Sequence, residues 1–151
     1  MLSFRQQRGV WRAIASAVAA ASHTGNTNET TLASIALPPL ITGDQVRVRS
    51  IWSYTSSANN KTLRARLGAT SISSNLYTNT ASAPLDFLIG IRGAASQVTG
   101  LATGLGTSSN SSPVASTIDV SAGATLTLNG LLANAGETVT LEEWVVELLR
   151  A

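Results

Sequence analysis

The 151-residue sequence contains no cysteine, only one histidine (His23), and few charged or aromatic residues. Without cysteine the chain forms neither disulfides nor thiolate metal sites, and one histidine excludes a metal site built from several histidines. Charged residues make up 12% of the chain, about half of the ~25% found in ordinary soluble domains. Serine, threonine, asparagine and glycine must therefore cover the surface. Such a neutral surface repels its neighbours weakly, which favours packing against copies of itself or other proteins.

The sequence also lacks any run of about 20 apolar residues, so we expect no transmembrane helix. The first 22 residues imitate a signal peptide, but Arg12 interrupts their apolar stretch and favours a retained segment. The net charge of +2 is a small excess and does not predict nucleic-acid binding. The N-terminal segment has too few bulky apolar residues to predict binding to a membrane surface.

Catalytic motifs are missing as well. A Ser-His-Asp triad would depend on His23, and no serine lies in a nucleophile-elbow motif. Glu142 and Glu143 are adjacent, so in a strand they point to opposite faces and cannot by themselves form the carboxylate pair of a glycosidase. The stretch "GLATGLG" lacks the lysine and the spacing of a phosphate-binding loop. The sequence therefore predicts a protein that is not an enzyme and that uses no cofactor.

The chain does contain short segments in which polar and apolar residues alternate. Glycine, asparagine and proline separate them, and this spacing is typical of an all-β sandwich or barrel. We predict a single antiparallel β-sandwich of jelly-roll type, with strands at residues 30–37, 46–54, 61–67, 85–93, 116–121, 124–132 and 138–149. The alternation assigns nine large side chains to its core: Trp52, Leu63, Phe87, Ile89, Leu126, Leu128, Trp144, Val146 and Leu148. Residues 94–116 fit either an irregular strand or a long loop.

Residues 1–21 differ from the β-domain of residues 22–151, and we expect them to form an N-terminal arm, either helical or extended. A helical wheel gives this arm an apolar face with Val10, Trp11, Ile14 and Val18, and a basic face with Arg5, Arg8 and Arg12. In the simplest interpretation the arm covers the open end of the domain. The sharper hypothesis is that it attaches the domain to a neighbouring protein, because its apolar face is poorly suited to water.

Residues 46–68 look like two strands around a polar turn, and they carry four arginines among the ten cationic residues of the chain. Pairing Trp52 with Ala65 or Leu67 would segregate apolar from charged side chains, whereas a slip of one residue would mix the two faces. We therefore expect the arginines to share one outer face, which must be wet or covered by something negative. They are Arg47, Arg49, Arg64 and Arg66.

In the final predicted strand, acidic residues alternate with apolar residues, as the arginines do in residues 46–68. If Trp144, Val146 and Leu148 point into the core, then Glu143 and Glu147 point outward, as the arginines do. We predict that the four arginines meet these two glutamates, either across adjacent strands or across a subunit boundary. The alternative is a solvated cationic face.

Three stretches, "SHTGNTNETTLASIALPP", "IWSYTSSANNKTLRARLG" and "AGETVTLEEWVVELL", resemble a small β-domain of tailed-bacteriophage virion proteins. The resemblance runs from about Ser22 to Leu149. It implies a structural virion protein, assembled in the host cytoplasm: a head decoration (cement) protein, a head fibre or a tail-fibre module. It also implies a homotrimer whose partners are other copies of the chain and virion proteins such as the major capsid protein.

Two functions from different classes follow: a structural protein of the virion, or a module that binds a receptor or a carbohydrate. A binding module should expose clustered aromatic residues beside carboxylates or amides. In this sequence Trp52 and Trp144 alternate into apolar faces, and only Tyr77 is expected to be exposed. The pattern therefore favours the structural role.

Overall fold

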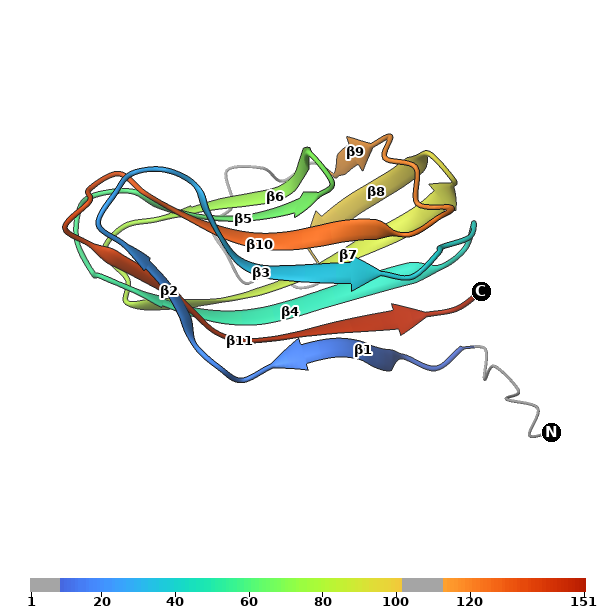
Figure 1. Cartoon of the computed structure of the whole chain (residues 1–151), viewed down its shortest axis with the longest axis horizontal. Coiled ribbons are helices and arrows are strands. Elements are labelled where there is room, and N and C mark those ends of the chain that lie inside the picture. The colour runs from blue at the N-terminus through green and yellow to red at the C-terminus, as the bar shows by residue number, and fades with distance from the viewer. Residues whose placement is uncertain (1–8, 102–112) are drawn as a thin grey trace.

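The computed structural model describes residues 9–101 and 113–151, and this part of the chain is all β (Figure 1). None of it is a helix long and apolar enough to cross a membrane. The strands are β1 Arg12–Ala17, β2 Ala21–Thr24, β3 Thr30–Leu37, β4 Gln45–Tyr54, β5 Lys61–Leu67, β6 Thr70–Tyr77, β7 Ser82–Gly93, β8 Ser96–Leu101, β9 Val114–Ser116, β10 Ala124–Leu132 and β11 Thr138–Leu149.

The strands form two antiparallel sheets that enclose one core (Figure 1). The larger sheet has seven strands in the order β1-β11-β4-β7-β8-β9, with β2 also paired to β11. The smaller sheet has four strands in the order β3-β10-β5-β6. Neighbours in both sheets are mostly non-consecutive in the chain, as in a jelly roll. The predicted all-β sandwich is confirmed.

The core lies between the inner faces of the two sheets. Val46, Val48 and Trp52 of β4 have no exposed surface, and they belong to the same buried cluster as Leu63 and Leu67 of β5 in the other sheet. Of the nine predicted core residues, eight are buried, whereas Trp144 is only half-buried. Alternation along the strands therefore predicted correctly which side chains point into the core, because successive side chains in a strand point to opposite faces.

The predicted hairpin of residues 46–68 is wrong. β4 lies between β11 and β7 in the larger sheet, and β5 lies between β10 and β6 in the smaller one. Trp52 is opposite Leu141 and Ala83, not Ala65 or Leu67. A hairpin and a connection that crosses between sheets bury the same alternate residues, so the apolar pattern does not distinguish them.

The N-terminal arm is extended rather than helical in its described part. Residues 12–17 of β1 pair with residues 144–148 of β11, and β2 continues along the same edge against residues 138–141. This short, alanine-rich stretch gains backbone hydrogen bonds from the edge of β11, whereas an isolated helix of its length is marginal in water. Arg5 and Arg8 lie outside the described residues.

The chain between β7 and β10 also departs from expectation. Residues 94–116 contribute β8 and the short β9, with residues 102–112 outside the described range. The strand predicted at residues 116–121 is absent, since β9 ends at Ser116. Asp119 makes a turn there: its Oδ1 accepts bonds from the backbone nitrogen of Ser121 at 2.9 Å and from its hydroxyl at 2.6 Å. These hydrogen bonds lower the pKa of Asp119.

Candidate interaction surfaces

The arginines of β4 lie on the outer face of the larger sheet. Arg47 Nε donates to Asp86 Oδ1 on β7 at 3.0 Å, and Arg47 Nη2 donates to the other carboxylate oxygen. Arg49 Nη2 lies 3.2 Å from Glu147 Oε2 on β11, which is one of the predicted pairs. The hydrogen bond to Asp86 raises the pKa of Arg47 above its usual value. Each arginine of this strand therefore has a carboxylate of its own.

The arginines of β5 lie on the outer face of the smaller sheet and share one carboxylate. Arg66 donates through Nε and Nη2 to the two oxygens of Glu29 at 2.7 and 2.8 Å, and Arg64 Nη1 also donates to Glu29. Asn129 of β10, the strand between β3 and β5, adds a bond from Nδ2 at 2.6 Å. The hydrogen bond from Arg66 is the main cause that lowers the pKa of Glu29 to about 2.

The prediction of one arginine face paired with Glu143 and Glu147 is thus largely wrong. The arginines occupy two faces, and only Arg49 has Glu147 as its nearest partner. Glu143 makes no ion pair within the part of the chain that the structure describes. The role of these residues in an interface stays a prediction.

Two acidic partners of the arginines, Asp86 and Glu29, were not predicted from the sequence. Asp86 carried a usable signal, because it alternates with Leu85 and Phe87 on a predicted strand and so had to point outward. Glu29 carried none, because it lies in a polar loop just before β3.

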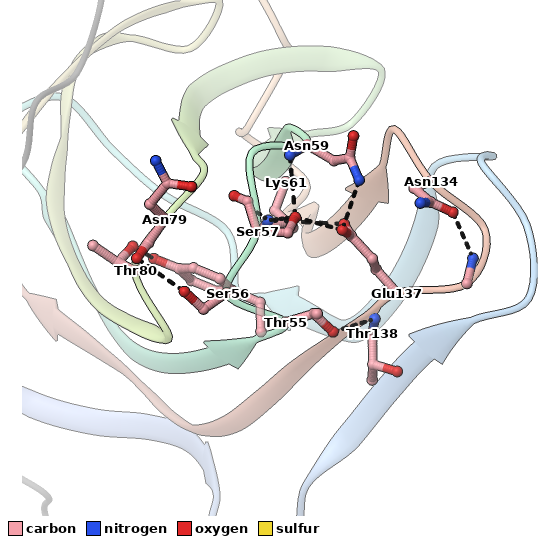
Figure 2. Close-up of polar contacts among 12 residues, drawn as sticks. Thr55, Ser56, Ser57, Asn59, Lys61, Asn79, Thr80, Asn134, Glu137 and Thr138 are labelled. Atoms are coloured by element: carbon pink, nitrogen blue, oxygen red, sulfur yellow. Dashed lines mark hydrogen bonds and ion pairs between the residues drawn. The ribbon is translucent and has the colours of Figure 1, made fainter.

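A buried polar cluster connects two loops, residues 55–60 and the β10–β11 loop, by hydrogen bonds at one end of the sandwich (Figure 2). Lys61 has no exposed surface, and its Nζ donates to the hydroxyl of Ser57 at 2.8 Å and lies 3.7 Å from Glu137 Oε2. Glu137 Oε1 accepts bonds from the Ser57 hydroxyl and from Asn59 Nδ2, the latter at 2.9 Å. The bond from Ser57 is the main cause that lowers the pKa of Glu137. The cluster joins residues 55–60 to the β10–β11 loop.

His23 makes a local hydrogen bond to a neighbouring strand. It is buried in β2, and its Nδ1 lies 3.0 Å from the hydroxyl of Thr30. No carboxylate among the described residues forms an ion pair with it. The same residues hold no cluster of three or more His, Cys, Asp or Glu side chains suited to a metal ion.

The N-terminal strand β1 and the residues on either side of it expose apolar side chains. Val10 is 49% exposed, Ile14 37% and Val18 85%, whereas Trp11 is half-buried and Arg12 is exposed. Among the described strands, β1 is the outermost of the larger sheet, so its free edge carries unpaired backbone groups. Of the residues predicted to form the apolar face of a helix, Ile14 lies on this edge strand, and Val10, Trp11 and Val18 lie just outside it.

A hollow of about 520 Å³ lies where β1 ends. Residues 16–18, 49–51, 84–86 and 143–145 line it, together with Asn75 and Tyr77 of β6. Two irregularities coincide at this row of the sheet: the pairing of β11 with β4 shifts between Leu141 and Glu143, and the edge formed by β1 and β2 is interrupted at residues 18–20. Such bulges re-aim side chains and open local gaps in a sheet.

Neither a protein-family model nor a curated protein sequence matches this chain. Among solved structures, lectin I of Ulex europaeus, in complex with the methyl glycoside of α-L-fucose, is 9% identical, with a TM-score of 0.45 over 93% of this chain and 91% of that one. The CBM2 module of the evolved Dit of Lactobacillus casei BL23 phage J-1 is 11% identical, with a TM-score of 0.39 over 76% and 67%. The VP2 subviral particle of infectious bursal disease virus is 9% identical, with a TM-score of 0.45 over 95% and 34%. Similarity this distant carries no argument about function.

Proposed function

We propose that the chain is a non-enzymatic structural protein of a bacteriophage virion, acting through contacts with copies of itself and with other virion proteins. A capsid decoration (cement) or head-fibre protein that associates as a homotrimer fits best, with the major capsid protein as its partner. The resemblance over residues 22–149 and the low charge of the chain support this assignment. The observation that carries it is the exposed apolar edge at the N-terminus.

Valine and isoleucine side chains on an edge strand would be costly to leave in water, and they are well placed to pack against another protein. Ile14 lies on β1, and Val10 and Val18 lie just before and just after this edge strand; all three side chains are exposed. We propose that this edge attaches the domain to its neighbour in the particle.

The other long edges also favour association. β3 and β6 are the outer strands of the smaller sheet, and neither contains a charged residue. Monomeric β-proteins commonly protect such edges with lysine or other charged residues, or with proline, because unpaired strands recruit other chains. Neutral edges of this length support a protein that works in an assembly.

The test is the mass of the purified full chain in solution, measured by light scattering. We expect a multiple of the 15.6 kDa subunit, most simply three copies. The double variant Ile14→Lys, Val18→Lys should lower that mass or abolish incorporation into the particle, because both side chains are exposed in the isolated subunit.

The matched control is Ile41→Lys, which changes an isoleucine that is 61% exposed in the β3–β4 connection. It should assemble like the unmodified chain. A subunit that stays monomeric at high concentration, or a double variant that incorporates normally, would contradict the proposal. Circular dichroism of both variants verifies that the β-fold is intact.

A further inference from the structure

We infer that the inner side of the hollow at the end of β1, between the two sheets, binds the ring of a small, neutral aromatic compound. This goes beyond the proposed structural role and does not depend on it. The volume of about 520 Å³ falls within the range of roughly 300–1,000 Å³ typical of small-molecule sites. The inference rests on the inward-pointing side chains that line this space, all of which are uncharged.

One row of side chains in the larger sheet forms one wall of the hollow. Residues directly opposite each other in neighbouring strands point to the same face of a sheet. The pairing puts four lining residues in such a row across β1, β11, β4 and β7: Ala17, Trp144, Ser50 and Leu85. Ser50 and Leu85 are buried, so the row points into the sandwich. Because Ala17 and Ser50 are small, they leave room on both sides of the Trp144 ring.

Two side chains of the smaller sheet form the opposite wall. Asn75 and Tyr77 of β6 both line the hollow. They lie opposite Leu63 and Lys61 of β5, which have no exposed surface, so Asn75 and Tyr77 also point into the sandwich. Tyr54 packs against Tyr77 with its ring centroid 5.5 Å away and fixes the position of that ring.

The two aromatic side chains of the hollow are only partly covered. Trp144 is half-buried, although Val146 and Leu148, which point the same way on β11, are buried. Tyr77 is half-buried as well. The hollow thus leaves inward-pointing aromatic surface in contact with solvent. A ring that enters would remove this surface from water and pack against both side chains in the offset or edge-to-face arrangement that aromatic rings prefer.

The inward-pointing polar groups are neutral and held in place. The Ser50 hydroxyl accepts a hydrogen bond from Trp52 Nε1 at 2.8 Å, which leaves its own proton for a second bond. Asn75 Nδ2 donates to the hydroxyl of Ser73 at 3.0 Å. Burial raises the pKa of Tyr77, so its hydroxyl stays protonated at neutral pH. Fixed polar groups bind a ligand with little loss of side-chain entropy, and these suit one hydroxyl or carbonyl group on the ring.

Charged ligands fit the hollow poorly, because the charged side chains that border it point to the outer face of the sheet. Arg49 and Asp86 alternate with inward-pointing residues of β4 and β7 and lie opposite each other. Glu143 lies opposite Ile51, which is 44% exposed. An ion in the hollow would therefore lose its hydration without meeting an opposite charge.

A sugar ring fits less well than an aromatic one. Its rim carries hydroxyl groups on all sides, whereas the inward lining offers only the polar groups of Ser50, Asn75 and Tyr77. Most of the sugar hydroxyls would lose water without gaining a hydrogen bond.

The experiment titrates the purified full chain at neutral pH with benzyl alcohol and with benzoate, each followed by calorimetry. The two compounds are similar in size, but benzoate carries a negative charge. We expect saturable binding of benzyl alcohol at one site per chain, and roughly tenfold weaker binding of benzoate, because the inward lining has no cation to receive it.

A substitution that fills the hollow tests its location. Ala17→Leu adds a branched side chain beside Trp144 and should weaken the binding of benzyl alcohol roughly tenfold. The matched control is Ala13→Leu, the same change on the same strand at an exposed position opposite Glu147 on the outer face. It should bind like the unmodified chain.

A measurement on the unmodified chain keeps the inference falsifiable even if Ala17→Leu loosens β1. Intermolecular NOEs should connect the ring protons of benzyl alcohol to the indole of Trp144. The inference is overturned if benzyl alcohol does not bind saturably, if benzoate binds as tightly, if these NOEs are absent, or if Ala17→Leu binds as well as Ala13→Leu. A chain that assembles but binds no benzyl alcohol leaves the structural role standing.

Discussion

The two arginine pairs have the same spacing in the sequence but are neutralised in different ways. On the larger sheet Arg47 and Arg49 each have a carboxylate of their own, whereas on the smaller sheet Arg64 and Arg66 share Glu29. The difference follows from the flanking strands. β7 and β11 beside β4 carry acidic residues, whereas β10 and β6 beside β5 carry none. The acid for the smaller sheet therefore comes from a loop.

Loss of one carboxylate should reduce stability more on the smaller sheet, where two arginines share it, than on the larger sheet, where each arginine has its own. Without Glu29, two guanidinium groups would remain side by side, and the amide of Asn129 would lose its acceptor. Without Glu147, Arg49 would lose its partner, but Arg47 would keep Asp86.

The largest effect is expected for Glu29→Gln, which keeps the size of the side chain but removes its charge. We expect the free energy of unfolding to fall by about 1–2 kcal/mol, the value of charge-assisted hydrogen bonds reduced for partial exposure to solvent. Urea unfolding at neutral pH measures this loss. If the urea midpoint of Glu29→Gln matches that of the unmodified chain, the shared carboxylate adds no measurable stability. The smaller sheet would then be no more sensitive to loss of its carboxylate than the larger sheet.

Acid should remove the same contribution without a mutation. The pKa of Glu29 is about 2 in the folded chain, against an ordinary value of 4.5. A carboxylate whose pKa is lowered by folding stabilises the fold fully above its unfolded pKa, and this stability is lost as the pH falls toward the folded pKa. The stability difference between the unmodified chain and Glu29→Gln should thus shrink as the pH falls from 4.5 to 2. Urea midpoints across this range test it, and a constant difference would exclude Glu29 as the cause.

The smallest effect is expected for Glu147→Gln. Arg49 is 47% exposed, so solvent screens its ion pair with Glu147. The free energy of unfolding should change by only ~0.2–1 kcal/mol, as is typical of exposed pairs. The comparison of the two faces fails if Glu147→Gln costs as much stability as Glu29→Gln under the same conditions.

Side-chain direction was predictable from the sequence, but strand partners were not. The alternation of Val46, Arg47 and Val48 is a local property, and it correctly sent the arginines outward. Pairing depends on segments far away in the chain: β4 pairs with β7 and β11, and the turn after Tyr54 crosses to the other sheet. The arginine partners could not be assigned while that pairing was unknown.

The N-terminal strand shows a second limit. An alanine-rich segment with Val10, Ile14 and Val18 at helical spacing is compatible with a helix and with an edge strand. The free edge of β11 decides between them, and no local pattern reports that edge.

The hollow had a usable signal in the final strand. Val139 and Leu141 are apolar at odd positions, whereas Trp144, Val146 and Leu148 are apolar at even positions. This change of parity marks the irregular pairing between Leu141 and Glu143. Residues from strands far apart in the sequence complete the lining, so its composition became visible only in the fold.

The antiparallel pairing of β1 with β11 has a mechanical consequence. Arg12 lies opposite Leu148, so the first residues of β1 are beside the last residues of the final strand (Figure 1). A pull that separates these two ends loads the hydrogen bonds one after another, as in unzipping, rather than all together, as in shear. β1 should therefore peel away at low force, while β2 and the sandwich beyond it remain unloaded. An attachment made through this strand would yield and lengthen before the domain itself is strained.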